Sequence, residues 1–220
     1  KESIHHFSKM VSGSPIKRPA WFFDVAQQGE GLVDITTHLV DLVQWECFPG
    51  RIINFKTDIE VISATRWPTK LTLAQFTHVT QLREFPDFLQ PHVAADGTLA
   101  VYANGEISYR INGVHAKVSV LWNFEAEPGA GDSHYSVMRG SRCNLVIRQG
   151  AAEGHQPTLT IEPVPGVERA DLQRALQPAM PGIQEAYPGV AVVPVGDGWK
   201  VNVPAAFHVG KNAADSTDRI

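Results

Sequence analysis

The chain has 220 residues, and 43% of them are hydrophobic, so it is long enough and apolar enough to bury a core. Its formal net charge is −4 and its basic residues are scattered, which argues against a nucleic-acid partner. No apolar run approaches the ~20 residues of a membrane-spanning helix, so no membrane partner is predicted. The two cysteines, Cys47 and Cys143, make no disulfide framework and are interpreted as small core residues. None of these features decides between a cytoplasmic and an exported protein.

The first third of the chain mixes helical and extended patterns. We predict a short amphipathic helix over residues 1–12, followed by an aromatic extended segment, RPAWFF. A longer helix is predicted within residues 29–50, because Pro49 and Gly50 are a strong end signal. Residues 52–67 alternate like a strand, and residues 71–82 are typical of a helix.

From about residue 97 the alternation indicates antiparallel strands. Asn-Gly pairs at 104–105 and 112–113 lie between β-rich runs, which predicts a hairpin turn at each. Later segments predict two strands in 136–150, a helix in 168–187 interrupted by two prolines, and two strands in 190–204. The predicted class is α+β, an open and largely antiparallel sheet of at least five strands with helices packed on one face. One domain is expected over 1–220, with 206–220 as a frayed tail.

The helix within 29–50 carries polar side chains in one row. At about 100° per residue, His38 falls about 40° from Asp34, Asp41 about −20° and Trp45 about 20°. These four residues form what we call the polar stripe. A stripe of this kind is typical of a solvated face. However, Asp34 and His38 are also within side-chain reach, and a carboxylate can orient an imidazole for general acid–base catalysis. A zinc site is not predicted, because no second His or Cys stands at ligand spacing.

The segment GEGLVDITTHLVDLVQW resembles the helix that opens the active site in the glucose–fructose oxidoreductase, inositol dehydrogenase and MocA family. In those proteins a glycine-rich entry is followed by Asp, His, Asp and an aromatic residue, here Gly29, Gly31 and the polar stripe. RPAWFF and GDSHYSVMRGSRCNLVI are similar to further family segments. The resemblance covers residues 1 to about 205.

The resemblance implies an oxidoreductase whose N-terminal Rossmann domain binds NAD or NADP. It implies that His38 exchanges a proton with a substrate hydroxyl and that Asp34 contacts the substrate. This chain has neither Gly-X-Gly-X-X-Gly nor Glu-Lys-Pro, so the Rossmann domain is expected to be missing from it. We therefore expect the substrate-binding and catalytic domain of an enzyme acting on a sugar or cyclitol hydroxyl. Without its Rossmann domain the chain is expected to bind no cofactor and to be inactive.

Further substrate-binding candidates are Arg18, Trp21, Asp41 and His134. Each has a structural alternative, namely a surface arginine, a core aromatic, a solvated helix face and a histidine at a strand edge. A rival function from another class is a non-catalytic carbohydrate-binding or oligomerisation module. An open sheet with one uncovered face also predicts a homo-oligomer that forms through that face. A metal-dependent lyase or isomerase would need clustered ligands, which the sequence does not show.

Overall fold

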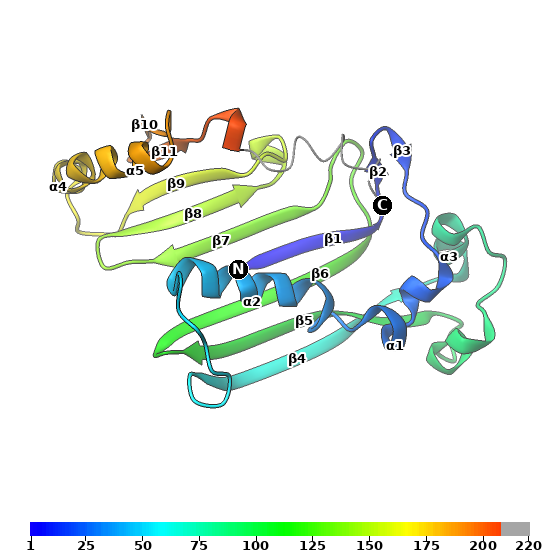
Figure 1. The fold of residues 1–220 in the computed structure, drawn as a ribbon. Helices are drawn as coiled ribbons and strands as arrows, with labels where there is room; N and C mark the ends of the chain where they lie inside the picture. The colour runs from blue at the N-terminus through cyan, green and yellow to red at the C-terminus, as the bar shows by residue number, and fades with distance from the viewer. Residues whose placement is uncertain (208–220) are drawn as a thin grey trace. The chain divides into compact units, whose positions relative to one another are not determined.

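Nine strands dominate the computed structural model, which describes residues 1–207 (Figure 1). They pair in the order β10-β11-β9-β8-β7-β1-β6-β5-β4, and β2 and β3 form a separate ribbon. Strand β1 runs parallel to β6, whereas the sheet is otherwise largely antiparallel. The predicted α+β class is confirmed. The strands are β1 (Glu2–Ser8), β2 (Met10–Val11), β3 (Ser14–Pro15), β4 (Ile59–Leu71), β5 (Leu99–Ile111), β6 (Val114–Glu125), β7 (Ser133–Arg139), β8 (Cys143–Gln149), β9 (Thr158–Pro163), β10 (Ala191–Val195) and β11 (Gly198–Asn202).

Helices connect these strands, and two of the predicted ones are confirmed as α2 and α3. The helix predicted in 168–187 is also present, and it is interrupted by a 3₁₀ segment at its prolines. The helical elements are η1 (Ala20–Phe23), α1 (Val25–Gln28), α2 (Asp34–Cys47), α3 (Leu73–Thr80), η2 (Asp87–His92), η3 (Ala151–Glu153), α4 (Arg169–Leu176), η4 (Gln177–Ala179), α5 (Met180–Ala186) and η5 (Ala205–Phe207). No helix among the described residues is long and apolar enough to cross a membrane.

The chain divides into two compact units. The first contains Lys1–Tyr135 and Gln149–His155, and the second contains Ser136–Arg148 and the chain from Gln156 onward. Of the predicted tail, 206–220, only residues 206 and 207 belong to the described part, where they end η5. Residues 208–220 lie outside it.

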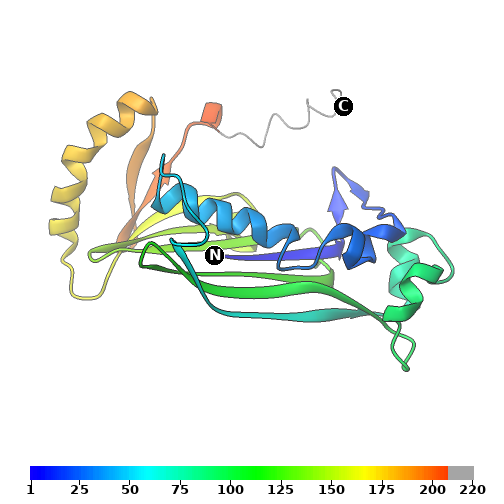
Figure 2. The same ribbon diagram turned by 60° about the horizontal axis from the view of Figure 1, so that its bottom comes forward.

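The first unit has two apolar clusters on the side of its strands that carries α2. Leu39 and Val43 of α2 pack against β5 and β6, where Tyr109, Ile111 and Val118 are buried. Figure 2 shows α2 lying along these strands. The second cluster joins the ends of β1, β4, β5 and β6 to η1, α3 and η2. Its fully buried members include Phe7, Phe23, Leu71, Phe76, Val79, Leu89 and Leu99.

The second unit has a smaller core. Ile161 of β9, Leu172 of α4 and Trp199 of β11 are its buried residues. The Arg169 guanidinium lies 5.2 Å from the centre of the Trp199 ring. Cys143 packs against this cluster, and Cys47 packs against the α2 core of the first unit. Both cysteines have free thiols, as predicted.

The predicted helix over residues 1–12 is wrong, because this segment contains strand β1. Ser3, His5 and Phe7 share one face of this strand, where the His5 and Phe7 rings both pack on Trp122. Pairing with β6 on one side and β7 on the other satisfies the backbone of the segment. The sheet overrides the weak helical pattern.

The two Asn-Gly pairs have different outcomes. Asn112 and Gly113 form the predicted turn between β5 and β6, with φ of 46° and 82°. The turn predicted at Asn104–Gly105 is wrong, because β5 continues through both residues, with a shift of its register against β4 next to Asn104. Asn104 is buried and bonds to three groups on β4 and β6, including the Trp122 backbone N–H at 2.6 Å. Gly105 is required for packing, since a Cβ there would lie 2.3 Å from the Leu32 side chain.

Candidate substrate site

Helix α2 begins against strand β5 at a glycine that leaves no room for a side chain. The Gly31 backbone N–H donates to the Tyr102 carbonyl at 3.0 Å. A Cβ at Gly31 would lie 2.1 Å from the Ala103 carbonyl oxygen. The buried Thr36 hydroxyl donates to the Gly31 carbonyl at 2.6 Å and joins the first turn of α2 to this entry. The glycine-rich entry therefore fixes α2 on the sheet of its own chain.

The polar stripe lies on the side of α2 that the core does not cover. Asp34 is half-buried, whereas His38 and Asp41 are exposed and Trp45 is 74% exposed. Within residues 1–207, no hydrogen bond or ion pair joins Asp34, His38 and Asp41 to one another. Asp41 and Trp45 border a shallow depression at the C-terminal end of α2. The stripe thus presents ionisable groups that are not committed to internal partners.

A small cavity lies at the N-terminal end of α2. Phe7, Phe22 and Trp122 form its aromatic wall, and Asp34 contributes a carboxylate. His38 is one helical turn further along and is not part of the lining. Its volume is about 10 Å³, enough for at most one water molecule, so a ring compound would have to lie at its mouth beside Asp34.

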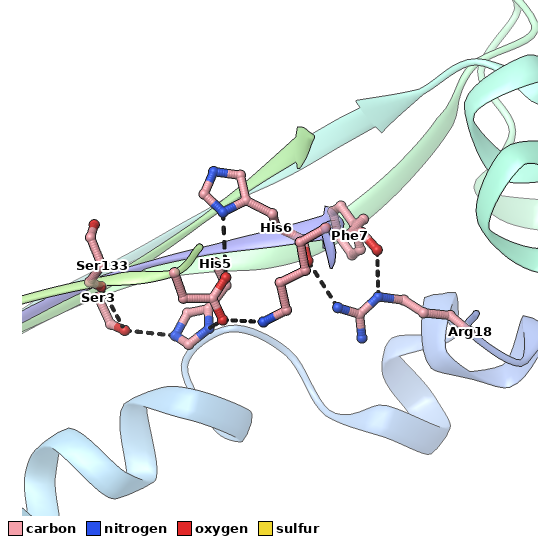
Figure 3. Close-up of polar contacts among 8 residues, drawn as sticks. Ser3, His5, His6, Phe7, Arg18 and Ser133 are labelled. Carbon is pink, nitrogen blue, oxygen red and sulfur yellow. Dashed lines mark hydrogen bonds and ion pairs between the residues drawn. The ribbon is translucent and has the colours of Figure 1, made fainter. Parts of the chain in front are cut away.

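Arg18 lies beside two of the rings that line this cavity. Its guanidinium is 4.2 Å from the centre of the Phe22 ring and 5.3 Å from that of Trp122. Arg18 Nε donates to the Phe7 carbonyl at 2.7 Å, and Nη2 donates to the His6 carbonyl at 2.8 Å (Figure 3). The side chain is only 9% exposed, so Arg18 is a buried and oriented cation, unlike a surface arginine.

The electrostatic setting of Arg18 is unbalanced. Burial lowers the pKa of the guanidinium, and the nearby carboxylates of Asp132 and Asp34 oppose this effect without overcoming it. Neither carboxylate forms an ion pair with Arg18 in the described part of the chain. The cation is therefore only partly compensated by its own protein.

A second group of polar side chains surrounds Asp132, and we call it the β1 cluster: Ser3, His5, His6, Lys9 and Asp132. The carboxylate contacts His5 Nδ1 at 3.0 Å and His6 Nδ1 at 3.4 Å, and it forms a close ion pair with Lys9. The Ser3 hydroxyl is 2.6 Å from His5 Nε2. Both ring nitrogens of His5 are thus engaged inside the protein (Figure 3).

The β1 cluster keeps Asp132 ionised. Burial alone would raise the pKa of this carboxyl, but hydrogen bonds and charge from His5 and Lys9 outweigh it, and the pKa falls well below its usual range. The His5 ring also stacks on Trp122, with the ring centres 5.0 Å apart. Sequence reasoning missed this cluster because it placed His5 and His6 in a terminal helix. ESIHHFS carries no period-two signal, because its apolar residues Ile4 and Phe7 are three positions apart.

The structure places the two remaining candidates outside the cavity lining. Trp21 is 47% exposed, and its neighbour Phe22 lines the cavity instead. His134 is half-buried on β7, opposite Ser3 of β1. Burial lowers the pKa of His134, and the positive charge of Lys1 lowers it further. His134 therefore belongs to the neighbourhood of the β1 cluster.

The glycine-rich segments of this chain do not fit a dinucleotide. Gly31 packs against the Ala103 carbonyl, so its backbone cannot approach a pyrophosphate. The first turn of α2 carries Asp34, which would repel phosphate. Gly129 and Gly131 precede strand β7 and no helix. Within residues 1–207, no three His, Cys, Asp or Glu side chains are arranged to hold a metal ion.

The comparisons with known proteins define the class. Residues 1–217 match the family described as "Putative oxidoreductase C terminal domain". The chain belongs to this family, the C-terminal domains of oxidoreductases of the glucose–fructose oxidoreductase, inositol dehydrogenase and MocA type.

A solved structure agrees with this assignment. The chain is similar to the crystal structure of a putative oxidoreductase from Parabacteroides merdae ATCC 43184, with 50% identity and a TM-score of 0.90. The match covers 99% of this chain and 50% of that one, so the chain spans about half the length of this relative. The comparison with curated proteins found no match.

Proposed function

We propose that this chain is the substrate-binding and acid–base half of an NAD(P)-dependent oxidoreductase that acts on a hydroxyl of a sugar or cyclitol. The observation that carries the proposal is the position of Asp34, which lines an aromatic cavity one helical turn before the exposed His38. Family membership supports the reaction class. The uncommitted state of both side chains supports a role toward a ligand.

In this proposal His38 takes the proton of the reacting hydroxyl, or returns it in the opposite direction. An exposed imidazole without an internal partner is suited to this, because both of its ring nitrogens are free to exchange a proton with a substrate hydroxyl. Asp34 accepts a hydrogen bond from a neighbouring hydroxyl and holds the ring in place.

The nicotinamide cofactor would belong to another domain of the complete protein and would exchange the hydride there. The glycine-rich segments of this chain do not fit a dinucleotide, so the chain alone should bind neither NAD nor NADP. We accordingly propose that it has no hydride-transfer activity by itself.

The test is steady-state kinetics of the complete protein, including its nucleotide-binding domain, with NAD or NADP and a panel of sugars and cyclitols. His38→Ala should lower turnover by ~100- to 10,000-fold, the usual contribution of a general acid–base group. His92→Ala is a matched control, since His92 is an exposed histidine at the end of η2. Unchanged turnover of His38→Ala on a confirmed substrate would remove His38 from the mechanism.

The alternative is a non-catalytic carbohydrate-binding or oligomerisation module. Its distinguishing result is ligand binding by the complete protein without cofactor reduction under any condition tested.

We also propose that copies of the protein associate through the sheet, and that the contact between the copies is polar. Ion pairs Glu60–Arg110 and Glu106–Lys117 lie on the face of β4, β5 and β6 opposite α2. Light scattering at several concentrations tests whether copies of the protein associate.

A further inference from the structure

The Arg18 guanidinium keeps one complete binding edge without a partner. A guanidinium has five N–H donors. Two of them are used by the carbonyls of Phe7 and His6, on the edge that Nε shares with Nη2. The edge between Nη1 and Nη2 makes no hydrogen bond within residues 1–207. Figure 3 shows the third nitrogen of Arg18 without a dashed line.

This arginine is also held rigidly. Its Nε and Nη2 are bonded to backbone atoms of β1, and its plane lies beside the rings of Phe22 and Trp122. The Trp122 ring is supported in turn by stacking on His5, whose two nitrogens are bonded to Ser3 and Asp132. An arginine positioned in this way loses little freedom when it binds a ligand, which is favourable for affinity.

The charges around Arg18 are compatible with a bound anion. Asp132 is already neutralised by Lys9 and bonded to His5 and His6, so it is not available as an ion-pair partner for Arg18. Asp34 influences Arg18 but does not pair with it. A buried cation without an ion-pair partner is unfavourable unless something else compensates it. The Phe22 and Trp122 rings beside Arg18 also form part of the wall of the small cavity that Asp34 lines.

We propose that the free edge of Arg18 binds a carboxylate of the substrate, so that the substrate class is a polyhydroxy carboxylic acid, an acidic sugar, and not a neutral sugar or cyclitol. The two N–H groups of this edge match the two oxygens of a carboxylate, the pairing in which arginine is most selective. The inference rests on the function proposed above and narrows its substrate. Arg18 fixes the acid group, and Asp34 and His38 act on hydroxyls of the same molecule.

The first experiment needs no variant. The complete protein is assayed with NAD and NADP on matched pairs, such as glucose against glucuronate and gluconate. The acids should be used with a kcat/KM about 10- to 100-fold higher than that of the neutral sugar, the ratio that one charge-assisted bidentate contact supplies. Equal or better use of the neutral sugars would overturn the inference while leaving the proposed function intact.

The second experiment uses Arg18→Gln, with Lys17→Gln as its control. Lys17 is the adjacent residue, is exposed and is no part of the site, so its variant should keep the wild-type preference. Arg18→Gln should lose the preference for acids, mainly through a ~10- to 100-fold rise in KM for glucuronate, and change KM for glucose much less. Arg18→Lys should show an intermediate preference for acids, because lysine keeps the positive charge but cannot donate two parallel hydrogen bonds to a carboxylate. An Arg18→Gln protein that stays folded and retains the preference would overturn the inference.

If no substrate is turned over, binding measurements distinguish the inference about Arg18 from the proposed oxidoreductase function. Calorimetry of the complete wild-type protein with glucuronate and with glucose measures recognition without chemistry. Binding of glucuronate in preference to glucose, without turnover of any acid or sugar, would support the role of Arg18 and count against the oxidoreductase function. Absence of preferential glucuronate binding in the wild-type protein overturns the inference even if Arg18→Gln does not fold.

Discussion

The first unit holds two groups of Asp and His side chains, and they are in opposite states. In the β1 cluster, Asp132 contacts two histidines and Lys9, and both nitrogens of His5 have partners. In the polar stripe, Asp34, His38 and Asp41 make no hydrogen bond or ion pair with one another within residues 1–207. The same residue types therefore occur once as a closed network and once as an open row.

The difference separates the roles that such residues can have. A group whose donors and acceptors are all occupied can hold a shape, but it cannot bind a substrate without first breaking its own contacts. A group in an open row contributes little to folding and is free to act on a ligand. The β1 cluster supports Trp122 and therefore the wall of the cavity. In our proposal the polar stripe supplies the groups that act on the substrate.

The largest expected effect comes from removing the contact that places the polar stripe on the sheet. Gly31→Ala puts a methyl group 2.1 Å from the Ala103 carbonyl oxygen, which is backbone and cannot turn away. We expect α2 to separate from β5 and the free energy of unfolding to fall by about 3 kcal/mol or more. Urea denaturation followed by tryptophan fluorescence measures this.

Gly131→Ala is the control for this change. Gly131 has open space around its Cβ position and no positive φ, so its variant should be close to neutral. Equal stability of the Gly31→Ala and Gly131→Ala proteins would contradict the close approach of α2 to β5.

A smaller effect is expected inside the β1 cluster. Asp132→Asn keeps the shape of the side chain but leaves Lys9 and two histidines without a carboxylate. Because the Asp132 side chain is only 24% exposed, we expect a loss of about 2 kcal/mol in the free energy of unfolding. Asp41→Asn in the exposed polar stripe is the matched control and should change stability by less than ~0.5 kcal/mol.

The contribution of Asp132 should also depend on pH. The folded state lowers the pKa of this carboxyl, because its hydrogen bonds and ion pair with His5 and Lys9 outweigh its burial. Its stabilisation is therefore complete above the unfolded pKa of about 3.9 and is lost as pH falls below that value toward the lower folded pKa. The stability difference between wild type and Asp132→Asn should therefore shrink as the pH falls below about 4. A difference that grows as the pH falls below about 4 would contradict the assigned network.

Local patterns predicted the parts of the molecule that depend on local physics. The end of α2 at Cys47 shortly before Pro49–Gly50, the turn at Asn112–Gly113 and the grouping of the polar stripe all follow from chain stereochemistry and periodicity. The continuation of β5 through Asn104–Gly105 did not follow, because it depends on Leu32 and Trp122, which are far away in sequence.

The same limit applied to the candidate site. Arg18, Asp34, Asp41 and His38 were proposed as candidates from their sequence context. The β1 cluster was not, because Asp132 is more than 120 residues from its histidines along the chain and reaches them only through the β1–β7 pairing. A pairing of this kind has no local signature.

The smallest expected effect tests whether the polar stripe contributes to the stability of the fold. His38 is exposed and has no hydrogen-bond partner in the described part of the chain, so His38→Ala removes no contact that folding needs. Alanine also has the higher helix propensity, and the two effects together should keep the change in unfolding free energy within about 0.5 kcal/mol of zero. His5→Ala is the counterpart from the β1 cluster. It removes two hydrogen bonds and a ring stacked on Trp122, and should cost about 2 kcal/mol. Parallel urea titrations of the two variants measure both values. A His38→Ala protein as destabilised as His5→Ala would show that His38 is a structural histidine, and the distinction between the closed cluster and the open row would not hold.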